Sequence, residues 1–143
     1  MKIAKIDARC LSVPIKFPFT ETPSKEGMLL VQVETDDGLV GHGISRDTER
    51  FAVRELINRD IGPFLIGKAP LDTEKIWMDA PWELGMSYMA ANGVVARAIS
   101  AVDQALWDIK GKSFGQPIYR LLGGASPDSV AAYTTFGFNV YSK

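Results

Sequence analysis

The hydrophobic pattern of this chain changes period once, and the change divides the sequence into a strand region and a helix region. From Ala4 to Cys10, small or apolar residues alternate with charged ones, which is the period-two pattern of a half-buried strand. Met28–Thr35 is rich in β-formers and is followed by Asp36-Asp37-Gly38, a turn sequence, and then by Leu39–Ile44. The first part of the chain therefore predicts a three-stranded antiparallel meander.

After Ser45 the apolar residues recur at helical spacing. Asp47 or Thr48 is suited to cap a first helix, which the pattern ends near residues 60–63. The predicted buried face of this helix consists of Phe51, Ala52, Leu56 and Ile57. Asp72 is suited to cap a second helix, which contains Ile76 and Trp77 and is expected to be interrupted at Pro81.

A longer helix is predicted from about Ala90, and it has two distinct sides to cover. Its core stripe, spaced at 100° per residue, comprises Ala91, Val95, Ala98, Ile99, Val102, Ala105, Leu106 and Ile109. A second side carries Ala96, Ser100, Asp103 and Trp107, where an amphipathic helix is normally charged. This helix therefore needs cover on two sides. A short helix is expected to begin at Pro117 and to stop at Gly123-Gly124.

The last uncharged stretch, Ser129–Phe138, favours a strand buried on both faces. Such a strand either pairs with the N-terminal sheet or belongs to a sheet whose other strands lie in sequence beyond Lys143. The join between the two parts is expected at Ala125–Asp128.

Composition restricts the classes of partner. With 16 basic and 17 acidic residues and no dense run of either sign, the chain lacks the charge pattern of a nucleic-acid or membrane-surface binder. One cysteine, Cys10, excludes an internal disulfide and is expected to be a buried structural thiol. The N-terminus lacks the apolar stretch of a signal peptide, so the expected location is the cytoplasm.

The residues alone predict no catalytic or metal site. The only histidine, His42, lies between Gly41 and Gly43 on a strand, and a packed or edge histidine is expected there. The two glycines lack the third glycine of a dinucleotide site and indicate close strand packing instead. No set of acidic side chains converges as metal ligands would.

Two longer motifs resemble a known family. Ala98–Lys112 and Gly115–Gly124 resemble the end of the N-terminal capping domain of the enolase superfamily, in the mandelate racemase and muconate lactonizing enzyme branch. Shorter likenesses occur at Thr35–Gly41, the hairpin turn, at Phe64–Gly67, a link between helices, and at Ala131–Tyr133, the first barrel strand. The resemblance implies an α+β fold: a three-stranded antiparallel meander, a helical bundle, and the first strand of a (β/α) barrel that is missing from the chain.

The resemblance also implies a function. Residues 1–124 would form a substrate-capping domain, and residues 125–143 would form the linker and first strand of a truncated barrel domain. In the family, Mg²⁺ and a base on the barrel support removal of the proton α to a substrate carboxylate. Because no such position falls in this chain, no catalytic residue and no metal ligand is assigned.

The parent enzyme is expected to dehydrate a sugar acid, or to racemise or epimerise a small carboxylate such as a hydroxy acid. We expect it to bind its own barrel domain and to form a homo-oligomer when full length. The chain alone is expected to be inactive. The alternative is a free-standing, non-catalytic α+β domain that binds a ligand or a protein.

Two loops carry the expected substrate contacts. The segment Pro14–Gly27 is longer than a connection between strands requires, and it is either a functional loop or a surface loop anchored by two aromatic residues. The resemblance places specificity residues in its central part, about Ile15–Glu26, and in a second loop at about Ser45–Glu49. The candidates are Phe17, Phe19, Thr20, Thr22, Ser45 and Arg46.

Two features qualify this transfer of contacts. Ile44 follows Gly43 where the family often has an acidic residue, so the contacts of the second loop are not transferred in detail. Arg46 or Lys25 either meets a substrate carboxylate or is simply a solvated cation.

Overall fold

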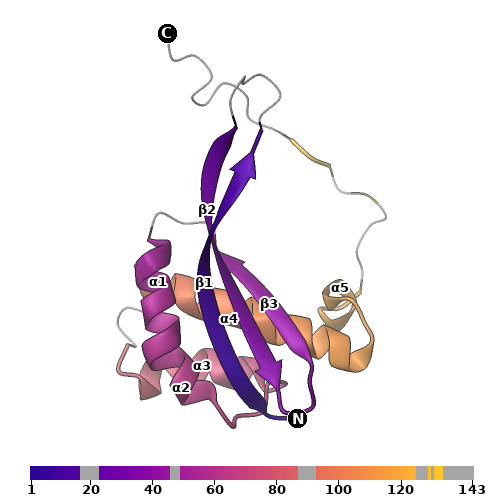
Figure 1. The fold of residues 1–143 in the computed structure, drawn as a ribbon. Helices are drawn as coiled ribbons and strands as arrows, with labels where there is room; N and C mark the ends of the chain where they lie inside the picture. The colour runs from indigo at the N-terminus through magenta and orange to yellow at the C-terminus, as the bar shows by residue number, and fades with distance from the viewer. Residues whose placement is uncertain (17–22, 46–48, 87–92, 125–128, 130, 134–143) are drawn as a thin grey trace.

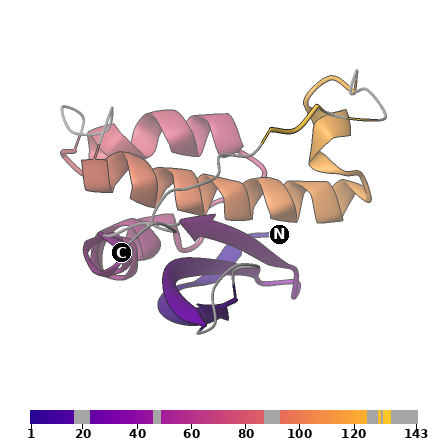
Figure 2. The ribbon, with the colours of Figure 1, turned by 90° about the horizontal axis from the view of Figure 1, so that it is seen from above.

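A sheet and two layers of helices make up the computed structural model, which describes residues 1–16, 23–45, 49–86, 93–124, 129 and 131–133. The strands are β1 (Ile3–Ile15), β2 (Ser24–Thr35) and β3 (Val40–Ser45), antiparallel in the order β1-β2-β3. Figure 2 shows helix α4 lying between the sheet and helix α3. The predicted three-stranded antiparallel meander followed by helices is confirmed.

The first two strands are longer than the sequence predicted. β1 runs on to Ile15 and β2 begins at Ser24, opposite it, so both ends of the predicted loop Pro14–Gly27 are paired strand. Beyond the level where β3 ends, the two strands continue as a two-stranded arm (Figure 1). Pro14 is tolerated because β1 is an edge strand, where a missing N–H costs no ladder bond.

The core face of the sheet is defined by its register. Ala8, Val31 and Gly43 align across the three strands, and all three are buried. Leu29 and Val33 lie on the same face of β2 and are also fully buried. On the other face of β3, His42 and Ile44 are exposed, as the period of a strand requires.

A single helical run follows, built from α1 (Arg50–Leu56), a π-helical segment η1 (Ile57–Ile61) and α2 (Gly62–Leu65). The predicted buried face was wrong at its start, because Phe51 is 54% exposed and Ala52 is also exposed. The buried side chains recur at every fourth residue instead, as Val53, Ile57, Ile61 and Leu65. In a regular α-helix this spacing drifts around the axis, and the wider π turn offsets the drift.

The predicted ends of this run also differ from the structure. Asp47 and Thr48 lie outside the described residues, and Glu49 occupies the N-cap position without a side-chain capping bond. Gly62-Pro63 does not end the helical run: Ile61 and Gly62 keep right-handed helical angles, and α2 continues through Pro63 to Leu65.

Helix α3 (Thr73–Glu83) begins at the predicted cap, Asp72, although Asp72 makes no side-chain capping bond. Pro81 was expected to interrupt this helix, but the helix continues through it to Glu83. Pro81 lies near the C-terminal end, so it removes only a late intrahelical bond, and it is buried beside Ala80.

Helix α4 (Gly93–Phe114) confirms the predicted core stripe in every described member, because all of them are buried; Ala91 lies outside the described residues. The predicted start near Ala90 also falls outside them. Helix α5 (Ile118–Leu121) begins after Pro117, and Gly123 and Gly124 follow with positive φ angles of 120° and 76°. Only glycine adopts such angles readily, so the predicted stop is confirmed.

The predicted strand Ser129–Phe138 is described only at Ser129 and at residues 131–133. These four residues are exposed and carry no strand assignment, and none of them joins the three-stranded sheet. The remainder of that segment lies outside the described residues.

Helix α4 packs very closely on β3 because two glycines face it. A Cβ atom added at Gly41 would lie 3.0 Å from the carbonyl carbon of Ala105, and one added at Gly43 would lie 2.9 Å from that of Ala101. Each added Cβ would lie closer still to the carbonyl oxygen of the same residue, nearer than real Cβ contacts allow. The close packing predicted from these glycines is therefore between strand and helix.

Polar side chains complete the outer edge of β3. The backbone N–H of His42 donates to Asp108 Oδ2 at 2.9 Å, and that of Ile44 donates to Gln104 Oε1 at 3.2 Å. Lys112 Nζ donates to the Val40 carbonyl at 2.6 Å. All three side chains come from one side of α4, so this helix satisfies a strand edge that would otherwise be open to another chain.

The opposite edge of the sheet is covered in a similar way. Asn58, in η1, accepts from the backbone N–H of Ala8 at 2.9 Å and donates to the Ala8 carbonyl at 3.0 Å. The side-chain amide of Asn58 therefore makes the two hydrogen bonds that the backbone of a neighbouring strand would make with Ala8.

We expect Gly43→Ala to destabilise the fold by about 3 kcal/mol, the upper end of the usual overpacking cost. The added methyl group meets the backbone of Ala101, which cannot rotate away as a side chain could. Chemical denaturation monitored by circular dichroism measures the free energy of unfolding. Ile44→Ala, on the exposed face of the same strand, is the matched control and should change it far less. A Gly43→Ala protein as stable as the wild type would contradict this packing.

A second prediction concerns Asp108. Burial raises the pKa of its carboxyl group, but hydrogen bonds from Lys112 and from the His42 backbone outweigh burial and hold the pKa below its ordinary value. Folding therefore favours the charged form of Asp108. The charged carboxylate stabilises the folded state above about pH 4, and this contribution is lost as the pH falls through the lowered pKa.

Asp108→Asn should consequently lower the melting temperature at pH 7 and lower it progressively less below about pH 4. Asp79→Asn removes only an exposed ion pair with Lys75 and is the control, for which little change is expected. A difference between Asp108→Asn and the wild type that does not vary with pH would refute the assignment.

Candidate functional site

Both predicted specificity loops leave the sheet at the same end. The first loop starts after Ile15 and returns at Ser24, at the tip of the arm. The second starts after Ser45, which pairs with Leu29. Because Leu29 also pairs with Cys10, the tip of the arm stands five residues beyond the second loop, or about 17 Å at 3.4 Å per residue.

Of the six predicted specificity residues, only Ser45 belongs to the described residues. It is the half-buried last residue of β3. Phe17, Phe19, Thr20, Thr22 and Arg46 lie outside the described residues. Lys25 is exposed on the arm, where it pairs with Pro14.

Arg50 connects the two loop regions and was not singled out in the sequence. It begins α1, directly after the second loop, and its guanidinium group lies against Gly27 of the arm. A Cβ atom at residue 27 would lie 2.6 Å from Arg50 Nε. The same guanidinium group lies 4.8 Å from the centre of the Phe51 ring. Gly27 is a glycine inside β2, and such a glycine marks a close approach, but it does not identify Arg50 as the neighbour.

Cys10 lies at this junction too. It is half-buried, packs against the hydrophobic core, and its Sγ lies 3.5 Å from the Arg50 carbonyl oxygen. The thiol therefore helps to pack the base of the arm on α1, but it is half-buried where the sequence predicted a buried thiol.

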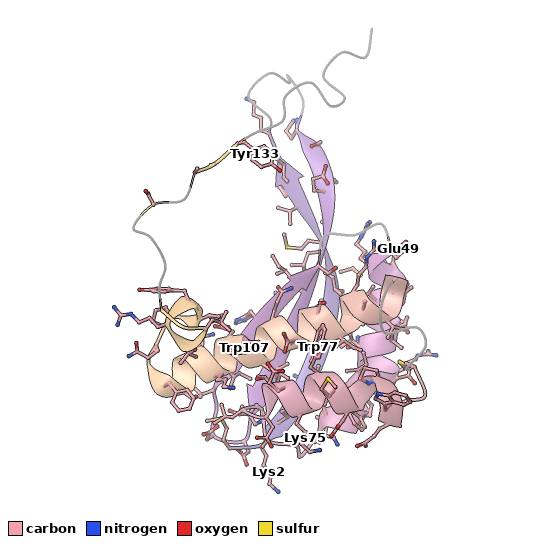
Figure 3. All side chains as sticks on the ribbon, turned by 180° about the vertical axis from the view of Figure 1, so that it is seen from behind. Lys2, Glu49, Lys75, Trp77, Trp107 and Tyr133 are labelled. Atoms are coloured by element: carbon pink, nitrogen blue, oxygen red, sulfur yellow. The ribbon has the colours of Figure 1, made fainter. Side chains whose placement is uncertain are left out.

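A second surface feature is an open groove of about 670 Å³ between α3, α4 and α5. Its lining residues are His42, Glu74, Asp103, Gln104, Trp107, Asp108, Ile118 and Leu122. It includes Asp103 and Trp107 from the predicted second side of α4, whose four members are all half-buried. Figure 3 shows Trp107 and Trp77 on the same side of the helical layer.

Acidic groups dominate the electrostatics of this groove. Burial raises the pKa of Asp103, and the nearby Glu74 carboxylate raises it further, whereas Lys110 opposes both effects. Lys110 Nζ lies 3.2 Å from Thr73 Oγ1 and 4.7 Å from the centre of the Trp107 ring. Neither Glu74 nor Asp103 makes a hydrogen bond or ion pair with another described residue.

His42 is an edge histidine, as predicted. Its ring lies 3.2 Å from the Gln32 side-chain amide and 3.6 Å from Asp108 Oδ2. In the described part of the chain, no group of three histidine, cysteine or acidic side chains is arranged to hold a metal ion. None of the helices in the described residues has the length and hydropathy needed to cross a membrane.

Comparison with known proteins identifies the fold. The model of the mandelate racemase / muconate lactonizing enzyme N-terminal domain matches residues 3–123. The chain is 42% identical over 113 residues to the D-galactonate dehydratase family member RspA of Pantoea ananatis, an alignment that covers 78% of this chain and 26% of the relative.

Solved structures agree with the sequence match. A member of the enolase superfamily from Polaromonas sp. JS666 superposes with a TM-score of 0.69 at 32% identity, over 86% of this chain and 33% of the other. A racemase from Streptomyces coelicolor A3(2) with bound magnesium gives a TM-score of 0.72 at 28% identity, over 85% and 35%.

The chain spans about a quarter of the length of the curated relatives that it matches and about a third of the length of the matching solved chains. The matched region falls on the N-terminal domain of the family and includes every strand and helix described above. The chain therefore belongs to the mandelate racemase and muconate lactonizing enzyme branch of the enolase superfamily, as its N-terminal domain.

Proposed function

We propose that this chain is the substrate-capping and specificity domain of a Mg²⁺-dependent enzyme that removes the proton α to a carboxylate. The supporting observation is the common origin of the two loops at one end of the sheet, one at the tip of the arm and one at its base. A substrate held there would be approached by both loops, and a closed lid would exclude water from the chemistry beneath it.

The proposed division of the chain is a capping domain at 1–124 and a linker with the first barrel strand at 125–143. The catalytic barrel would follow Lys143. The described residues form no metal cluster, so the magnesium ligands are proposed to lie on that barrel and no catalytic step is assigned to this chain. When bound, the metal would stabilise the negative charge that develops on the substrate carboxylate as the proton is removed.

The substrate is proposed to be a small carboxylate, and dehydration of a sugar acid is preferred to racemisation or epimerisation. This preference rests on the name of the Pantoea ananatis relative, a D-galactonate dehydratase family member, although a racemase is among the structural neighbours. In a dehydration, the α-proton and a β-hydroxyl group leave as water and the resulting enol becomes a keto acid.

The coding sequence beyond Lys143 gives the simplest test of a catalytic parent. We expect an open reading frame that supplies a lysine pair on one predicted strand and single acidic residues on three successive later strands. A stop codon directly after Lys143 would instead leave a free-standing, non-catalytic binding domain.

A fusion protein tests the same proposal by activity. We expect the chain joined to the part of the Pantoea ananatis relative that follows the matched region to form a keto acid from D-galactonate or another aldonate in the presence of Mg²⁺. The chain alone should form none, because it lacks the barrel. A soluble, folded fusion protein that turns over no carboxylate in a panel of sugar acids and hydroxy acids would count against the proposal.

The specificity residues are tested in that fusion protein. Phe19→Ala and Arg46→Gln should each lower kcat/KM by about tenfold, the effect of about 1.4 kcal/mol of lost transition-state binding. An unchanged melting temperature is expected with it, so that the kinetic effect is separated from a loss of folding. Phe114→Ala is the control, because that ring is 56% exposed at the end of α4. Unchanged kinetics in a Phe17→Ala, Phe19→Ala and Arg46→Gln triple variant would remove these loops from the substrate site.

A further inference from the structure

The two-stranded arm leaves the sheet beyond the end of β3, so the third strand does not fix its direction. The last pair between β2 and β3 is Leu29 with Ser45, and from there the ladder between β1 and β2 continues alone to Ile15 and Ser24. An isolated pair of strands is only marginally stable in water and twists more strongly than a wider sheet. The arm therefore needs contacts from outside the sheet to keep one direction.

Arg50, the first residue of α1, contacts both strands at the base of the arm. Its guanidinium group lies against Gly27 of β2, and its carbonyl oxygen lies 3.5 Å from Cys10 Sγ of β1. Gly27 is two positions beyond the fully buried Leu29, and alternate residues of a strand share a face, so the guanidinium group continues the core face along the arm. Figure 1 shows the start of α1 level with the base of the arm.

The contact depends on the missing side chain of Gly27. A Cβ atom there would lie 2.6 Å from Arg50 Nε, closer than real Cβ contacts come, so glycine leaves the space that the guanidinium group fills. This group is planar and weakly hydrated, and it packs well on exposed backbone and on aromatic rings. It also lies 4.8 Å from the centre of the Phe51 ring. Gly27 and Arg50 are therefore matched to each other in shape.

The same contact lies between the starting points of the two predicted specificity loops. The second loop, at about Ser45–Glu49, ends directly before Arg50. The first loop is carried by the arm, whose last pair, Ile15 with Ser24, is three pairs beyond Gly27, or about 10 Å at 3.4 Å per residue. A change in the direction of the arm is largest at its tip, so a contact at its base controls where the first loop stands relative to the second.

We propose that Arg50 is a positioning residue for substrate binding. Its guanidinium group, packed on Gly27, holds the arm in one direction against α1 and keeps the two loops at the separation that the substrate requires, while Arg50 itself touches no substrate. This inference rests on the proposed function, because it requires that the loops contact the substrate. An arm that takes several directions leaves only a fraction of the molecules ready to bind, and the apparent dissociation constant rises by the inverse of that fraction.

Distances between two spin labels test the contact without any enzyme activity. Nitroxide labels are attached to Lys25→Cys on the arm and to Arg59→Cys on η1, both exposed positions, in the chain carrying Cys10→Ser. The serine hydroxyl can still donate to the carbonyl oxygen of Arg50. We expect one narrow distribution of distances, which broadens in Arg50→Ala.

Two further variants make this measurement specific. Gly27→Ala should broaden the distribution as well, because its methyl group displaces the guanidinium group, and it should stay folded, because the methyl group meets a movable side chain and no backbone. Arg54→Ala is the matched control, since Arg54 lies on the same helix and its side chain donates to Glu55. It should leave the distribution narrow.

Steady-state kinetics test the consequence for the substrate, in the fusion with the following part of the Pantoea ananatis relative. Arg50→Ala and Gly27→Ala should each raise KM by about tenfold, the factor that about 1.4 kcal/mol gives, and leave kcat nearly unchanged. The split is expected because saturating substrate selects the competent direction of the arm. The double variant should also lose about tenfold instead of about a hundredfold, since both substitutions remove one contact. Arg54→Ala should change neither constant.

The results also separate this inference from the proposed function. A distribution that stays equally narrow in Arg50→Ala would overturn the positioning role, and an active fusion with an unchanged KM in that variant would overturn it while leaving the function standing. Effects of the two substitutions on KM that multiply would also contradict it, because they would arise from separate contacts. Broadened distances in the chain, together with a folded fusion that turns over no carboxylate, would support the contact and count against the function.

Discussion

The contact between Gly41 and Gly43 of β3 and the backbone of α4 at Ala101 and Ala105 determines how the rest of the domain is arranged. Only residues without a Cβ on the strand let the helix axis approach so closely. At that distance, helix side chains reach the edge of β3. Four residues of helix advance about 6 Å and two residues of strand about 6.7 Å, so Gln104, Asp108 and Lys112 meet successive backbone groups of the strand. Helix α4 thus takes the place of a fourth strand.

The position of α4 also fixes the separation of the two surface features. One side of the helix is committed to the sheet and another faces α3, so the groove opens along its remaining length toward α5. The loops, in contrast, leave the end of the sheet from which the arm rises (Figure 1). The groove and the starting points of the two loops therefore lie on different elements of one core.

The sequence predicted the elements whose pattern is local. The alternation in β1, the turn at Asp36-Asp37-Gly38 and the stripe of α4 all appear in the structure. The predictions from the sequence were wrong where contacts between residues distant in sequence determine the local structure. Pro14 suggested a loop, but pairing with Lys25 keeps it in a strand. Phe51 looked like a core residue, but the buried ridge is displaced to Val53 and Ile57, and the π turn that maintains it has no local signature.

Arg50 could not be found because its partner, Gly27, is distant in sequence.

The arm also sets the reach of the first loop. Its register runs without a shift from Leu11 and Met28 to Ile15 and Ser24, so its length is a whole number of residue pairs. Successive strand side chains point to opposite faces, and a change of one pair would turn the loop over. Relatives that keep the loop facing the same way can therefore lengthen or shorten the arm only in steps of two pairs, or about 7 Å. Each such step would raise or lower the start of the first loop with no change to the core below.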